Sequence, residues 1–83
     1  MANLPHFVAT ETWQELTGVS GVNAKFTIQN IGGFVFYIYI GITPNVQDSN
    51  QISNSAYLEN DTAEQVWVLA ESNTVKIAIQ QGA

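Results

Sequence analysis

The chain has 83 residues, a formal net charge of −5 and no cysteine, and we expect residues 1–83 to form a single domain with one core. The absence of cysteine excludes disulfides and thiolate zinc sites. Two basic residues against seven acidic ones disfavour nucleic acid and membrane surfaces as partners, because both are bound through clusters of Lys and Arg. Small domains without disulfides or metals often rely on oligomerisation, so we expect self-association.

The first sixteen residues predict an arm followed by two short strands. Residues 1–6 have neither the basic nor the apolar region of a secretory signal. We therefore expect them to be an N-terminal arm, on a protein made in a cytoplasm and not secreted. Short strands are predicted at residues 7–9 and 13–16. A short helix over residues 10–16 is the alternative, because Thr10 and Glu11 resemble a helix start.

Two later segments alternate between apolar and polar residues with the period of a β-strand. They are residues 25–30 and residues 74–80, and each is expected to turn one face to the core and the other to water. The predicted core of the chain consists of Phe26, Ile28, Phe36, Ile38, Val66, Val68, Ile77 and Ile79.

Glycine and asparagine mark the predicted turns. The glycine pair Gly32 and Gly33 supplies the backbone freedom that a tight hairpin needs, which predicts that strands 25–30 and 34–40 pair antiparallel. Residues 71–73 are predicted to join strands 65–70 and 74–80 in the same way. Residues 41–55 are predicted to form a long polar loop that crosses between sheets, followed by a brief strand at 56–58.

These elements predict an all-β fold with short strands and frequent turns. About six or seven short strands of this kind are typical of a small antiparallel β-sandwich or a jelly-roll-like barrel. We therefore expect one such domain.

Two of the predicted strands are apolar on both faces. In residues 34–40 and 65–70, one face joins the core, and the opposite face carries Val35, Tyr37, Tyr39, Trp67 and Leu69. Soluble monomers seldom expose a large apolar patch, and charged residues are depleted at interface cores. We therefore predict that these five residues form an interface. The alternative is that loops of the same chain cover them.

Candidate catalytic and metal-binding residues are few. His6 is the one histidine and has no acidic neighbour to orient it. Glu59, Asp61 and Glu64 lie close in sequence but lack the spacing of a calcium loop. We expect no catalytic residues, no cofactor and no metal site, and hence a protein that is not an enzyme. The tryptophans and tyrosines leave open a surface that stacks on sugars.

The order of several short motifs resembles that of short virion proteins of tailed bacteriophages. The motifs are residues 13–16 (Trp-Gln-Glu-Leu), residues 28–30 (Ile-Gln-Asn), a strand ending in Gly41, residues 66–68 (Val-Trp-Val), and Val75, Ile77 and Ile79 at alternate positions. The resemblance implies a structural component of the virion, such as a capsid decoration or cement protein, a head fibre or a tail attachment module.

Two functions are therefore expected from the sequence. In the first, the chain is a structural subunit of a phage particle that forms a homotrimer and docks on a larger virion protein such as the major capsid protein. In the second, it is a β-sandwich module of a tail or fibre that binds carbohydrate or a host receptor. Aromatic residues buried between subunits favour the first function, whereas aromatic residues along an exposed groove favour the second.

Overall fold

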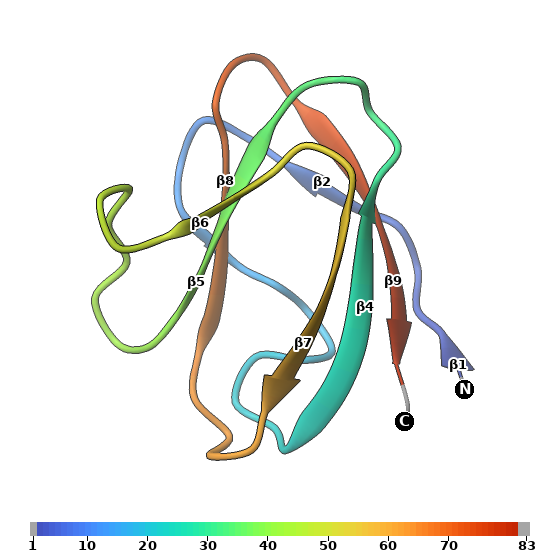
Figure 1. Ribbon diagram of the computed structural model, residues 1–83, viewed down its shortest axis with the longest axis vertical. Helices are drawn as coiled ribbons and strands as arrows, with labels where there is room; N and C mark the ends of the chain where they lie inside the picture. The colour runs from blue at the N-terminus through green and yellow to red at the C-terminus, as the bar shows by residue number, and fades with distance from the viewer. Residues whose placement is uncertain (1, 82–83) are drawn as a thin grey trace.

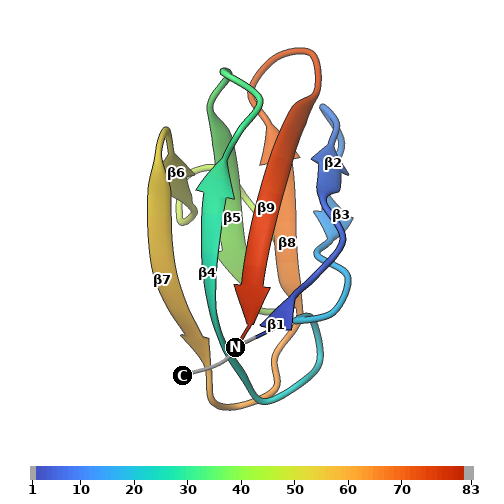
Figure 2. The same cartoon turned by 90° about the vertical axis from the view of Figure 1, so that its right-hand side faces the viewer.

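The computed structural model describes residues 2–81 as two antiparallel β-sheets that pack face to face (Figure 1 and Figure 2). No helix occurs among these residues, so the predicted all-β sandwich is confirmed and the alternative helix over residues 10–16 is not formed. The strand segments are β1 Ala2–Asn3, β2 Phe7–Ala9, β3 Gln14–Glu15, β4 Ala24–Asn30, β5 Phe36–Ile40, β6 Asn50–Ile52, β7 Ser55–Asn60, β8 Val66–Ala70 and β9 Val75–Gln81.

The first sheet has the order β1-β9-β4-β7, and β2 pairs with β9 on the same side as β1. The backbone N–H of Leu4 donates to the carbonyl of Ile79 at 3.0 Å, so β1 and β2 act as one interrupted edge strand. The described part of the predicted arm, residues 2–6, therefore lies along the edge of the first sheet. The second sheet has the order β3-β8-β5-β6.

Most connections pass from one sheet to the other. Of the links between the described strands, only those from β1 to β2 and from β5 to β6 stay within a sheet. This strand order, with two interleaved Greek keys in two four-strand layers, is that of a jelly roll. In Figure 2 the chain passes repeatedly between the two layers.

The predicted hairpins at residues 31–33 and 71–73 are wrong. The first links β4 to β5 and the second links β8 to β9, and in both cases the two strands lie in different sheets. The Asn30 side chain accepts hydrogen bonds from the N–H groups of Gly32 (3.0 Å) and Gly33 (3.2 Å), while the N–H of Ile31 donates to the carbonyl of Lys76. These bonds hold the turn as an arch over the core instead of a two-strand hairpin.

The connection at residues 41–55 also differs from the predicted loop. It contains β6, which pairs antiparallel with β5 in the same sheet, and the crossing to the first sheet follows at residues 53 and 54. The polar residues Asn50 and Gln51 hide this strand in the sequence, because only Ile52 of the three turns into the core.

The core lies between the sheets and contains all eight predicted residues. Alternation explains this result, since alternate residues of β4, β5, β8 and β9 are buried as far as Ile28, Ile38, Ala70 and Ile79 respectively. One polar side chain is also buried among the described residues, that of Asn60 at the end of β7. It donates to the carbonyls of Val19 (3.2 Å) and Glu64 (2.6 Å) and accepts from the N–H of Glu64 (2.8 Å). It therefore ties two loops at one end of the sandwich.

Candidate functional site

The outward surface of the second sheet carries the five residues that the sequence singles out. We call this surface the aromatic face and define it by Val35, Tyr37, Tyr39, Trp67 and Leu69. Tyr37 lies opposite Leu69 and Tyr39 lies opposite Trp67 in the ladder between β5 and β8. Directly opposite side chains in a ladder are in contact range, so four of the residues form a compact cluster.

Val35 precedes β5 and continues its alternation, with its carbonyl accepting from the N–H of Glu71 at 3.1 Å. All five residues of the aromatic face are half-buried within the single chain. Part of each side chain is therefore still open to a partner. The structure brings the predicted residues together on one face of the second sheet.

One end of the aromatic face is built around Gly41. The indole N–H of Trp67 donates to the carbonyl of Gly41 at 3.0 Å, which fixes the tilt of the indole. A Cβ atom at Gly41 would lie 2.9 Å from Cε2 of Tyr39, and the φ angle of +151° also favours glycine. Glycine at this position therefore lets the Tyr39 ring lie directly against the backbone.

The other end of the aromatic face is polar. The Tyr37 hydroxyl donates to Oε2 of Glu71 at 3.0 Å, and Nε2 of Gln51 donates to the same oxygen at 3.2 Å. The hydrogen bond to Glu71, partial burial and the negative charge of Glu71 raise the pKa of Tyr37, while the bond to Gln51 acts in the opposite direction. Tyr37 therefore remains a neutral donor at physiological pH. Glu71 places one carboxylate beside the apolar cluster.

Further apolar side chains lie close to the aromatic face along the chain. Ile42, next to Gly41, is 83% exposed, and Phe34, next to Val35, is 47% exposed. Ile42 lies outside the strand alternation that singles out the aromatic face, and one exposed isoleucine in a polar loop is no signal by itself. Gly41, Gln51 and Glu71 were also missed, because their contacts depend on strand pairing.

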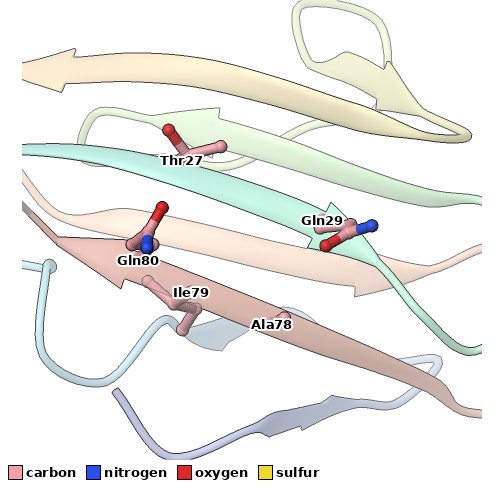
Figure 3. Close-up of a pocket in the computed structure, with 5 residues that line it drawn as sticks. All are labelled: Thr27, Gln29, Ala78, Ile79 and Gln80. Carbon is pink, nitrogen blue, oxygen red and sulfur yellow. The ribbon is translucent and has the colours of Figure 1, made fainter. Parts of the chain in front are cut away.

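The outward surface of the first sheet is polar by contrast. Lys25 and Lys76 are exposed there, and between them the sheet carries a shallow hollow of about 170 Å³ lined by Thr27, Gln29, Ala78, Ile79 and Gln80. Figure 3 shows the side chains of Thr27 and Gln29 on β4 beside Gln80 and the short Ala78 on β9, to which they are paired in the sheet. This face confirms the prediction that β4 and β9 each have one wet side.

The described residues contain no cluster of three or more His, Cys, Asp or Glu side chains that could hold a metal ion. His6, Glu59, Asp61 and Glu64 are all exposed. No helix that is long and apolar enough to cross a membrane occurs between residues 2 and 81.

Comparisons with known proteins add no relative. The chain matches no protein-family model, and searches of curated proteins and of solved structures returned no match.

Proposed function

We propose that this chain is a non-enzymatic structural component of a bacteriophage particle, of the capsid decoration, cement or head-fibre type. It acts by associating with copies of itself and by docking on a larger virion protein such as the major capsid protein. The observation that carries the proposal is the aromatic face, which places Tyr37, Tyr39, Trp67 and Leu69 side by side on the outside of a sandwich that already has a complete core.

The energetics of the aromatic face support an interface. Complete burial of one large apolar side chain contributes roughly 1.5–3 kcal/mol, so four half-buried side chains offer several kcal/mol to a partner. Tyr and Trp are enriched at interfaces, where the ring is buried and the polar atom keeps a hydrogen bond. Tyr37 and Trp67 have such bonds, to Glu71 and to the carbonyl of Gly41.

The architecture and the charge are consistent with this function. Jelly rolls occur in viral capsid proteins and in lectins. Charged residues make up 11% of the chain, against about 25% in ordinary soluble domains. A subunit that is largely covered by neighbours needs few charges, because charged groups are depleted at interface cores. A homotrimer is the assembly that the resemblance to phage virion proteins implies.

The test compares two tyrosine substitutions on opposite sides of the molecule. The double variant Tyr37→Ser/Tyr39→Ser removes two rings from the aromatic face, while Tyr57→Ser removes a 53% exposed ring from β7 in the first sheet. We expect sedimentation velocity to give a smaller species for the double variant, and the wild-type species for Tyr57→Ser. Equal masses for the wild type and the double variant would exclude the aromatic face as the contact.

The location in the particle has a separate test. We expect mass spectrometry of purified virions, produced from the genome that encodes this chain, to detect it in stoichiometric amounts with the capsid proteins. Its absence from intact virions, with abundant expression in the infected cell, would contradict the proposal.

A tail or fibre module that binds carbohydrate is the second candidate. The observation that favours it is the neighbourhood of Tyr37, Glu71 and Gln51, where a ring lies beside a carboxylate and an amide. Rings that stack on sugars are commonly accompanied by such hydrogen-bonding groups. A glycan array would support this function if binding is lost in Tyr37→Ser and kept in Tyr57→Ser. If no glycan on the array binds, the carbohydrate-binding function is excluded.

A further inference from the structure

Strand β7 forms an open edge of the first sheet. Among residues 2–81 it pairs only with β4, through an unbroken register that runs from Ala24 opposite Asn60 to Gln29 opposite Ser55. Natural edge strands are usually protected by brevity, proline, charged side chains (lysine above all) or a bulge. The edge strand β6 is three residues long, and Pro5 interrupts the edge formed by β1 and β2. Strand β7 has six residues without proline or lysine, and Glu59 is its one charged residue.

The ladder determines which backbone groups of β7 are free. The N–H of Asn30 donates to the carbonyl of Asn54 at 2.7 Å, and antiparallel ladders alternate between bonded and non-bonded pairs. Ala56 and Leu58 therefore direct their N–H and C=O groups to β4. Those of Ser55, Tyr57 and Glu59 point away from the sheet, and no hydrogen bond within residues 2–81 engages them.

The sequence of β7 is complementary to itself in the antiparallel direction. If a second β7 is placed about a two-fold axis at Tyr57, Ser55 lies opposite Glu59 of the other copy, and Ala56 lies opposite Leu58. Polar residues then face polar residues, apolar residues face apolar ones, and no like charges meet. Ala56 and Leu58 are half-buried and pack against the core beneath β7. The pairing would also cover the part of each side chain that is still exposed.

We propose that β7 is a strand-addition edge at which a second copy of this chain pairs antiparallel about Tyr57. Ser55, Tyr57 and Glu59 each exchange backbone hydrogen bonds with the opposite residue of the second copy, and the two first sheets become one continuous sheet. This contact uses the β7 edge of the first sheet and does not depend on the aromatic face or on the proposed function.

The experiment separates the two contacts by working in the Tyr37→Ser/Tyr39→Ser background. There we expect analytical ultracentrifugation at high protein concentration to give a species of twice the chain mass. Adding Tyr57→Pro removes an N–H that points away from β4, in a place where an edge strand tolerates proline, and we expect it to give a monomer. Adding Tyr57→Ser keeps the N–H and should leave the dimer intact.

A monomeric Tyr37→Ser/Tyr39→Ser variant, or a dimer that persists when Tyr57→Pro is added to it, would overturn the inference. Either result would leave the proposed function standing. If the proline variant does not fold, amide hydrogen exchange of the Tyr37→Ser/Tyr39→Ser variant shows whether two β7 strands pair. The amide of Tyr57 is expected to exchange slowly at high concentration and rapidly on dilution. Rapid exchange at every concentration would equally overturn the inference.

Discussion

Replacement of Asn60 by alanine is expected to destabilise the fold strongly, although Asn60 is a polar residue and not one of the apolar residues of the core. The substitution removes a side chain that is 1% exposed and makes hydrogen bonds with Val19 and with both backbone groups of Glu64. Each bond contributes about 1 kcal/mol net, so the expected loss is about 3 kcal/mol. A chain of this size has a free energy of unfolding of roughly 4–12 kcal/mol. The loss corresponds to a fall in Tm of about 12–24 °C.

Urea unfolding followed by tryptophan fluorescence measures this loss. The midpoint should fall while the slope stays unchanged, because the folded state keeps its compactness. Asn45→Ala is the matched control, since Asn45 accepts a hydrogen bond from the N–H of Asp48 in an exposed loop, where water can replace it. Its effect is expected within about 0.5 kcal/mol. Equal midpoints for Asn60→Ala and Asn45→Ala would refute the argument that Asn60 ties the two loops.

Three further predictions concern the core, one turn and the rim of the aromatic face. Phe36→Ala should lower the free energy of unfolding by about 3–5 kcal/mol, and an unchanged urea midpoint would show that Phe36 is not buried. Gly32→Ala should lower Tm, because the new Cβ would lie 2.5 Å from the backbone nitrogen of Lys76; an equal or higher Tm contradicts this. The raised pKa of Tyr37 means that its stabilising contribution is complete below about pH 10 and is lost as the pH rises through the folded value. NMR titration of the Tyr37 ring should give a lower midpoint in Glu71→Gln, and an unchanged midpoint excludes Glu71 as the main cause.

Alternation in the sequence was sufficient to predict the inward and outward faces of the main strands. Phe26 and Ile28 in β4, and Phe36 and Ile38 in β5, are buried as expected, because a period of two leaves only two possible faces. The five residues of the aromatic face follow from the same rule. Once Phe36 points inward, its neighbours on either side point outward.

Strand pairing could not be predicted from the same pattern. A glycine pair permits a tight hairpin and also permits an arch between two sheets. The strands on either side show the same alternation of apolar and polar residues in both cases. The choice is made by contacts that are distant in sequence, such as the bond between Ile31 and Lys76. The contacts of Gln51 with Glu71, and of Trp67 with Gly41, depend on this pairing. The contacts of Gln51, Glu71 and Gly41 at the aromatic face could therefore not be predicted, because the strand pairing was not.

Solvent accessibility of the aromatic face in the assembled state tests the central claim most directly. Hydroxyl-radical footprinting, read by mass spectrometry, would compare purified assemblies with protein that has been diluted to the monomer. We predict that oxidation of Tyr37, Tyr39 and Trp67 is strongly reduced in the assembly, because a partner covers the part of each side chain that a single chain leaves open. Equal oxidation of these residues in the assembly and in the monomer would contradict the account.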